Sequence, residues 1–464
     1  MIAATIGRTF LDAWNNKYQK DYSAKEFFAK EYFSLFFDHP KYMQWVTNSP
    51  FVQMKKGQKP ETLTPQERKE KLNDLYTKID SGLRDASIAI GFPASEEKEY
   101  ATTSGLVTDL DLQYDAEEVY LSWIGSGLGV GVAGGYSIFF DHPQILLTLY
   151  YGWKVYRRFL NDPILNKMRG NQINTWNGQW LYYSYSFDFE ENPDFGYLLN
   201  YDVFTQNEKI IEVNTIFWAK FYFNLSEKLN EEVITAYVYS LGQTNKTLGF
   251  IPFRFNQGRS ILSIYKILFG ESDALRQKKD YENMFGIHIK RACELGSIGL
   301  QALEPHGLRE YFDKAKMPDY SIKIISPKNG ESSESFEERS GRVKQQEYEN
   351  LISFRTYKTW LIAMITKNKQ ENLHYSEAIA KALVTYRNAD KKLSTGRKNK
   401  LENLLSAKTK KNFLEELTEL VKDFDEDNLN LLKELQEKVY LMTSEDFGYF
   451  VVLLKFDYAY QEKN

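Results

Sequence analysis

Apolar residues recur at three- and four-residue spacing through the last third of the chain, which is the pattern of amphipathic helices. The spacing predicts six helices, at residues 348–369, 376–390, 396–406, 410–424, 426–443 and 447–460. Helices joined by such short connections pack their apolar faces against one another. We therefore expect residues 346–464 to form a C-terminal helical bundle.

The pattern is more mixed before residue 325. Residues 24–37 predict an aromatic amphipathic helix, and Thr64-Pro65 marks the start of a charged helix over 64–85. Runs of aromatic and β-branched residues at 180–189 and 213–223 predict strands.

Domain boundaries follow from these patterns. Pro, Gly and Ser cluster with charged residues over 318–342, which is typical of a loop. We expect an α+β protein, with an irregular mixed α/β N-terminal domain at 1–324, a linker or surface loop at 325–345 and the bundle at 346–464.

Composition excludes several classes of protein. The chain of 464 residues has a single cysteine, Cys293, so a disulfide framework and a zinc site built on several thiolates are both excluded. Its five histidines lack the H-x-x-x-H spacing of zinc hydrolases. We expect no metal and no other cofactor.

Two segments bear on the location of the protein. The first twenty residues lack the layout of a secretory signal, which favours the cytoplasm. Residues 119–140 carry no charge, but they include six glycines and have no basic flank, so a membrane-spanning helix is disfavoured.

The bundle sequence is polarised in charge, although the whole chain has a net charge of only −4. Residues 355–411 hold 14 Lys or Arg against 4 Asp or Glu, whereas residues 412–464 hold 5 against 13. The basic half can bind a phosphate backbone with release of counterions. Alternatively, the two halves pair with each other across the bundle.

A glycine-rich run at 124–136 contains G-x-G-x-x-G at Gly129, Gly131 and Gly134. A dinucleotide site needs this motif between a strand and a helix, with an acidic residue about twenty positions later. Lys154 stands near that position instead. The run therefore predicts a loop that lets the backbone approach another segment or a nucleic acid closely.

Basic and amide side chains gather over 144–180. Basic side chains suit phosphate contacts, and amides suit base edges; the alternative is that the amides cap turns. The phosphate-binding candidates here are Arg157, Arg158, Lys167 and Arg169, and the amide candidates are Asn171, Gln172, Asn174 and Asn177.

A second segment, 242–270, has basic and aromatic residues and no acid. This composition is typical of a groove that follows a nucleic-acid strand, and a core hairpin with a positive rim is the alternative. Its phosphate-binding candidates are Lys246 and Arg254, and its aromatic residues include Phe250, Phe253, Phe255 and Tyr265.

Several segments in order resemble the large-subunit family of type I CRISPR Cascade, the Cas eight family, closest to the I-B or I-A branch. They are SWIGSGLGVGVAGGYSIFFD (122–141), GWKVYRRFL (152–160), GNQINTWNGQWL (170–181), GQTNKTLGFIPF (242–253) and FRTYKTWLIAMI (354–365). The resemblance runs from about residue 85 to the end. Some relatives carry a cysteine-based zinc motif, which this chain lacks.

The resemblance implies a non-catalytic subunit with several macromolecular partners. The N-terminal part of such proteins docks on the crRNA 5′ handle and the Cas five subunit, beside the Cas seven backbone. It reads a short PAM in target double-stranded DNA and separates the strands, while base pairing with the guide supplies most of the sequence specificity. The bundle follows the displaced strand and stabilises the R-loop, and the complex recruits the Cas three helicase-nuclease.

The resemblance also suggests roles for the candidate residues. The four amides are candidates for PAM or strand-separation contacts, and the basic residues of both segments are candidates for phosphate contacts. Five basic residues of the bundle are candidates for the displaced strand: Lys391, Lys392, Arg397, Lys398 and Lys400.

Two other classes of function stay open. Asp109 and Asp111, with neighbouring acids, suit a metal-dependent nuclease. A scaffold without nucleic-acid binding fits if the charged halves of the bundle pair internally.

Overall fold

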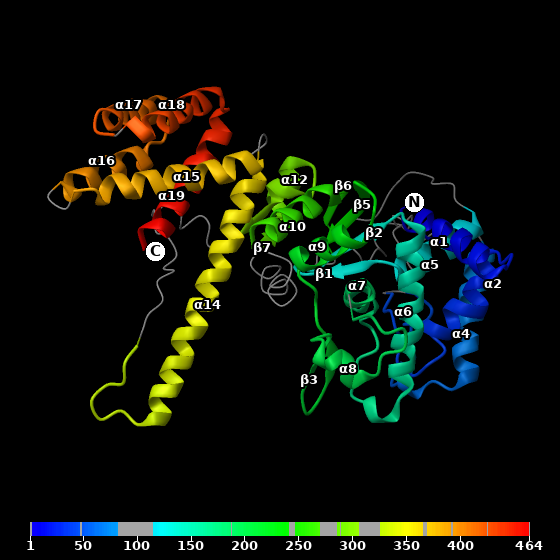
Figure 1. Cartoon of the computed structure of the whole chain (residues 1–464). Coiled ribbons are helices and arrows are strands. Elements are labelled where there is room, and N and C mark those ends of the chain that lie inside the picture. The colour runs from blue at the N-terminus through cyan, green and yellow to red at the C-terminus, as the bar shows by residue number, and fades with distance from the viewer. Residues whose placement is uncertain are drawn as a thin grey trace. The chain divides into compact units, whose positions relative to one another are not determined.

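The protein has an α+β fold in two compact units, Met1–Phe255 and Asn256–Asn464 (Figure 1). The computed structural model describes residues 2–46, 49–81, 115–186, 188–240, 246–269, 285–287, 289–305, 325–364, 369–390, 393–424 and 426–463. Each unit is described by itself.

The first unit combines helices with a small antiparallel sheet. Its helices are α1 (Ile2–Tyr18), α2 (Ala24–Phe27), the π-helical turn η1 (Phe28–Tyr32), α3 (Phe33–Phe36), η2 (Pro60–Thr62), α4 (Pro65–Asp80), α5 (Ala116–Gly127), α6 (Pro143–Asn161), η3 (Pro163–Leu165), α7 (Ile173–Ser184), α8 (Phe195–Asn200) and α9 (Trp218–Lys228). The helix predicted over 24–37 is confirmed, as is the start of α4, where Thr64 and Glu67 form a reciprocal capping box.

Helices α1 and α5 cross at very short distance because glycines lie at the crossing. A Cβ on Gly125 would lie 1.8 Å from the carbonyl oxygen of Ala3, and one on Gly7 would lie 2.1 Å from that of Leu121. A larger residue at either position would have to push the two backbones apart.

The main sheet has the strand order β1-β2-β5-β6, with every neighbouring pair antiparallel. The strands are β1 (Val130–Val132), β2 (Tyr136–Phe140), β5 (Val233–Ser240) and β6 (Lys246–Arg254). A shorter pair, β3 (Phe204–Gln206) and β4 (Ile211–Val213), forms a second sheet. A mixed α/β arrangement was expected for this part of the chain.

Two strand predictions are wrong. Residues 180–184 belong to α7, and most of 213–223 belongs to α9. In α7 the buried aromatics Trp176, Trp180 and Tyr183 recur at helical spacing. Helix α9 has its unburied residues Lys220, Glu227 and Lys228 on one side, but its run of aromatic residues is also typical of a strand.

The second unit is mainly helical. Its elements are α10 (Phe255–Phe269, which starts at the boundary), β7 (Phe285–Ile287), α12 (Ile289–Leu295), η4 (Leu300–Ala302), β8 (Leu303–Pro305), α14 (Ser333–Met364), α15 (Lys369–Asn388), α16 (Ser394–Ser406), α17 (Lys410–Val421), α18 (Glu426–Leu441) and α19 (Ser444–Lys463). All six predicted bundle helices correspond to helices α14–α19.

The domain boundaries differ from the expected ones. The division lies at 255/256 and not at 324/346. Residues 333–345, expected in a linker, form the first part of the 32-residue helix α14. Turn-forming Ser and Gly residues are tolerated there because this part of the helix is solvated, with no buried residue before Ile352.

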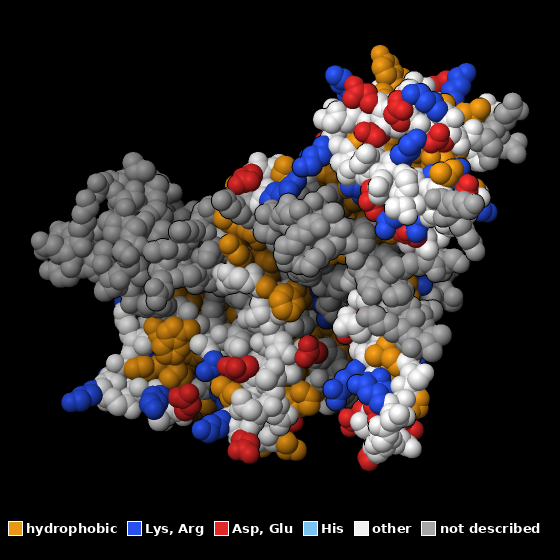
Figure 2. Space-filling model, turned by 90° about the vertical axis from the view of Figure 1, so that its left-hand side faces the viewer, with side chains coloured by type: hydrophobic (Ala, Val, Ile, Leu, Met, Phe, Trp, Pro, Cys, Tyr) orange, Lys and Arg blue, Asp and Glu red, His pale blue; other side chains and the backbone are white. Residues whose placement is uncertain are grey.

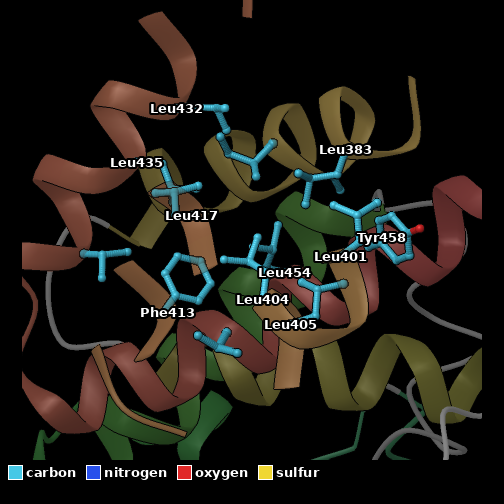
Figure 3. Packing of buried hydrophobic residues seen from close by; sticks show 14 of the residues in the cluster. Leu383, Leu401, Leu404, Leu405, Phe413, Leu417, Leu432, Leu435, Leu454 and Tyr458 are labelled. Carbon is cyan, nitrogen blue, oxygen red and sulfur yellow. The ribbon is translucent and has the colours of Figure 1, made fainter. Parts of the chain in front are cut away.

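The bundle core consists mainly of leucines from α15 to α19. Figure 3 shows Leu404, Phe413 and Leu454 approaching one another from α16, α17 and α19. Each of the three is fully buried. No helix among the described residues is long and apolar enough to cross a membrane.

Candidate nucleic-acid interface

The glycine-rich run joins a helix to a β-hairpin. It comprises the end of α5, strand β1, a turn at Gly134 and Gly135, and the start of β2. Both turn glycines have positive φ angles, of 86° and 72°, which glycine adopts readily. Since a helix precedes β1 and a strand follows the turn, this is not the strand–helix context of a dinucleotide site.

Asn177 of α7 anchors the glycine run from within the core. Its side chain is fully buried, and its Nδ2 donates to the carbonyl oxygens of Gly127 (2.8 Å) and Gly129 (2.9 Å). Its Oδ1 accepts a hydrogen bond from Trp153 Nε1 at 3.2 Å. Asn177 therefore has a structural role, and no part of it is left at the surface for a PAM contact.

Beside the hairpin turn lies an open pocket of about 270 Å³. It is lined by residues 131–136, by Asn174 and Thr175 of α7, and by Thr215 and Phe217. Phe217 is 68% exposed, and Asn174 Nδ2 donates to Ser137 Oγ at 3.2 Å. Of the four amide candidates, Asn174 is the one that lines this pocket.

The other two amides lie on the approach to α7. Asn171 is exposed, whereas Gln172 is half-buried and its Oε1 accepts the backbone N–H of Val213 at 3.1 Å. Gln172 thus ties the start of α7 to β4, and its side chain does not cap a turn.

The basic candidates of this region differ in exposure. Arg158, Lys167 and Arg169 are exposed. Arg169 pairs with Glu212 at 2.6 Å, and Arg158 donates to the carbonyl oxygen of Pro193. Exposed pairs of this kind contribute little to stability, so a phosphate can compete for these side chains.

Arg157 lies in the core. Its Nε donates to the carbonyl oxygen of Leu35 at 2.7 Å, its Nη1 donates to that of Lys41 at 3.1 Å, and Nη2 also reaches Leu35. Burial lowers the pKa of its guanidinium to about 10. Because its donors hold the loop after α3, Arg157 is not available as a surface phosphate contact.

His39 is part of this buried basic region. Its Nδ1 accepts the backbone N–H of Lys41 at 2.9 Å. Burial lowers the pKa of the imidazole to about 4, and the charges of Arg157, Arg68 and Lys41 act in the same direction. His39 is therefore neutral at pH 7, with its proton on Nε2.

We expect His39 to make stability depend on pH. Between pH 6.5 and pH 4 the imidazole is protonated in the unfolded chain but not in the folded one. The contribution of His39 to stability is therefore fully present above pH 6.5 and is lost as the pH falls towards 4. Since the ring is partly exposed, solvent screening reduces the loss to about 1 kcal/mol. Urea unfolding measures the free energy of unfolding at pH 7 and at pH 4.5. The decrease between the two pH values should be smaller for His39→Asn than for the wild type. Equal decreases in the two proteins would contradict the assignment.

One face of the main sheet carries exposed aromatic and basic side chains. Phe250 is 65% exposed on β6, and Arg254, four residues later on the same face, is also exposed. Tyr237 lies opposite Phe250 in the register, with ring centroids 5.3 Å apart. We call Tyr237, Phe250 and Arg254 the β5–β6 face.

The aromatic residues of the 242–270 segment thus have different roles. Phe253 and Phe255 are fully buried and Tyr265 is nearly so, which leaves Phe250 as the exposed ring among them. The core hairpin with a positive rim is the arrangement that the structure has, because β5 and β6 pair and Arg254 is exposed on their outer face; the groove for a nucleic-acid strand stays a prediction. Lys246 begins β6.

The bundle candidates make contacts within the bundle. Lys400 pairs with Asp423 at 2.6 Å, and Lys398 lies 3.7 Å from Glu402. Arg397 Nη1 donates to the carbonyl oxygen of Tyr386 at 2.8 Å. Figure 2 shows basic and acidic side chains interspersed over the helices at the top of the view, α17 and α18 among them. The pairing of Lys400 with Asp423 joins the basic half to the acidic half.

Several candidates lie outside the described residues: Lys391, Lys392, Asp109 and Asp111. Within the described part of the chain, no group of His, Cys, Asp or Glu is placed to hold a metal ion.

Sequence reasoning missed the exposed Phe217. Phe217 lies between β4 and α9, outside any regular element. The periodicity of apolar residues in the sequence therefore could not show that its side chain is exposed. Comparison with protein-family models, curated proteins and solved structures finds no match for this chain.

Proposed function

We propose that this chain is a non-catalytic nucleic-acid-binding subunit, and that it acts in the cytoplasm as the large subunit of a type I CRISPR Cascade complex. The five ordered segments that resemble the Cas eight family support the second part. The β5–β6 face supports the first part, because it carries an exposed ring and an exposed guanidinium on the same side of one strand.

Such a face suits a single strand of nucleic acid. Bases of any sequence can stack on Phe250, and Arg254 can contact the phosphates that connect them. A sheet with exposed aromatic rings is also a common platform for single-stranded RNA. In the proposed complex the strand is either the crRNA handle or a separated strand of the target DNA.

The candidate PAM contacts reduce to Asn171, Gln172 and Asn174. Arg158 in the last turn of α6, with Lys167 and Arg169 on the segment between α6 and α7, are the candidate phosphate contacts. In the bundle, Arg397, Lys398 and Lys400 remain candidates for the displaced strand, although their internal contacts favour the scaffold alternative for this unit. Recruitment of the Cas three helicase-nuclease is part of the proposal.

We expect Phe250→Ala to weaken binding of single-stranded DNA by about 5- to 150-fold, since stacking contributes about 1–3 kcal/mol per base. Arg254→Ala should lower the slope of log affinity against log salt by about 0.7. Fluorescence anisotropy with a labelled oligonucleotide over a salt series measures the affinity and the salt slope. The measurement is made with the isolated chain and with the chain assembled in the guide complex.

Matched controls test whether the effect is local. Ile164→Ala removes another exposed apolar side chain of the first unit, 86% exposed, and Lys209→Ala removes another exposed charge. Both should bind like the wild type. If all four variants and the wild type share one affinity and one salt slope, the β5–β6 face does not bind nucleic acid.

A further inference from the structure

The pocket beside the β1–β2 turn has an exposed aromatic ring on its rim. Phe217 lines this pocket and is 68% exposed, whereas its neighbours in the chain, Ile216 and Trp218, are both buried. A single exposed apolar side chain is common at protein surfaces. What distinguishes Phe217 is that its ring borders a cavity, where a ligand can cover it.

Hydrogen bonds on both sides of Phe217 fix its backbone against the hairpin. The N–H of Ala133 donates to the carbonyl oxygen of Ile216 at 2.9 Å, and Trp218 Nε1 donates to the carbonyl oxygen of Ala133, also at 2.9 Å. The rings of Trp218 and Tyr136 meet edge to face, with centroids 5.8 Å apart. A ligand that stacks on Phe217 therefore needs little ordering of the backbone around it.

A second wall of the pocket comes from the first turn of α7. Strand β1 packs against this helix (Figure 1), and a Cβ on Gly131 would lie 2.9 Å from the carbonyl oxygen of Asn174. One turn further along α7, a Cβ on Gly178 would lie 2.3 Å from the carbonyl oxygen of Gly131. Because only glycine allows so close an approach, the hairpin and α7 hold the pocket at a fixed width.

Asn174 brings an amide to the pocket. Its Nδ2 donates to Ser137 Oγ at 3.2 Å, and no other hydrogen bond of this amide forms within the described part of the chain. Since a primary amide has two N–H donors and a carbonyl acceptor, Asn174 keeps one donor and its acceptor for a ligand. Thr175 and Thr215 line the same pocket and add hydroxyl groups. The pocket thus combines an aromatic face with groups that can bond the edge of a planar ring.

We propose that this pocket binds one unstacked nucleobase, which stacks on Phe217 and is hydrogen-bonded along its edge by Asn174. Aromatic rings and polar side chains hold bases in this way once they have left a duplex or a stacked strand. The volume of about 270 Å³ lies just below the range of about 300–1,000 Å³ for drug-sized ligands, so it suits one ring system. The base belongs to a nucleic-acid strand or to a free nucleotide, and only the first source rests on the proposed function.

A pocket of this kind takes a base only after the base has left a duplex. Inside a duplex the two faces of a base are covered by its neighbours, and only its edges are open in the grooves. Asn174 therefore contacts a separated strand, which is the second of the roles suggested for the amides. Asn171 and Gln172 stay candidates for contact with an intact flank.

Photocrosslinking with the full chain tests the stacking on Phe217. Light breaks the carbon–iodine bond of 5-iodouracil and joins the base to an aromatic ring on which it is stacked. A single-stranded oligonucleotide that carries 5-iodouracil should label the peptide containing Phe217, as identified by mass spectrometry of a digest. 5-Iodouridine monophosphate is the probe for a free nucleotide, and labelling by the oligonucleotide alone indicates a base held within a strand.

Variants separate stacking from general apolar contact. Phe217→Leu keeps an apolar side chain without an aromatic face, so it should abolish the crosslink and weaken oligonucleotide binding by about 5- to 150-fold in fluorescence anisotropy. Phe217→Trp should keep both, and Asn174→Ala should weaken binding by about 2- to 10-fold. Ile164→Ala, which removes another exposed apolar side chain, should bind like the wild type.

The outcomes distinguish this pocket from the β5–β6 face. The proposal is overturned if no label appears on the Phe217 peptide, or if the wild type, Phe217→Leu and Asn174→Ala share one affinity. Labelling of Phe250 with none of Phe217 removes the pocket and leaves the proposed function in place. Labelling of Phe217 by the mononucleotide, without any binding of oligonucleotides, supports the pocket and contradicts the proposed function.

Discussion

Lys358→Met should lower the free energy of unfolding of the second unit by about 3–5 kcal/mol. Lys358 and Asp457 form a buried ion pair between α14 and α19, with Nζ 2.9 Å from Oδ1. Nζ also lies 2.7 Å from Glu377 Oε1, and Ser376 Oγ donates to the other oxygen of Asp457 at 2.7 Å. Without Lys358, the Asp457 carboxylate stays buried with one hydroxyl as its partner.

The charge states of the pair support this expectation. Burial alone lowers the pKa of the Lys358 ammonium, but the carboxylates of Asp457 and Glu377 raise it on balance, so Lys358 is charged. Burial raises the pKa of the Asp457 carboxyl. Lys358 and Ser376 act against this rise through hydrogen bonds to the two carboxyl oxygens, so removal of Lys358 leaves Asp457 buried without its charged partner.

Urea unfolding monitored by circular dichroism measures the effect. Lys398→Met, which removes a half-exposed lysine facing Glu402, should cost less than about 0.5 kcal/mol. The double variant Lys358→Met/Asp457→Leu should recover much of the loss, because an apolar pair can replace a buried ion pair. A loss for Lys358→Met no larger than that for Lys398→Met would contradict the role of the network.

The helices of the bundle were predictable because each has one buried face. Leu401, Leu404 and Leu405, for example, follow helical spacing in the sequence and lie in one core. Helix α9 was misread as a strand because it contains a run of aromatic residues, which is typical of strands: Trp218, Phe221, Tyr222 and Phe223. The start of α14 was misread as a linker because a solvated helix has no apolar stripe to reveal it.

The candidate sites show a different limit of sequence reasoning. Asn171 and Asn177 have the same chemistry and lie six residues apart, yet one is exposed and the other fully buried. Arg157 and Arg158 differ in the same way. The helical phase of α6 separates the two arginines, whereas Asn171 lies before α7 and Asn177 lies on the buried part of it. Both placements depend on contacts distant in sequence. The burial of Arg68 could not be predicted either, since a lone arginine in a charged helix gives no sign of burial.

Asn177→Leu should therefore lower the free energy of unfolding by about 3–5 kcal/mol. The leucine fills a similar volume but removes the hydrogen bonds to the carbonyl oxygens of Gly127 and Gly129 and to Trp153 Nε1. Each buried polar group that loses its partner costs about 1–3 kcal/mol. The glycine run that shapes the pocket beside Asn174 loses its anchor at the same time.

The matched control is Asn171→Leu, the same change at the exposed amide. It should shift the free energy of unfolding by less than about 0.5 kcal/mol, while its effect on DNA with different flanks reports on a surface contact. Chemical unfolding of both variants, with oligonucleotide binding measured under conditions where each is folded, separates the two roles. A fully buried amide can affect DNA binding only through the backbone that it holds, and loss of that anchor must also lower stability. If the two variants are equally stable and Asn177→Leu alone has a binding defect, the structural role of Asn177 is contradicted.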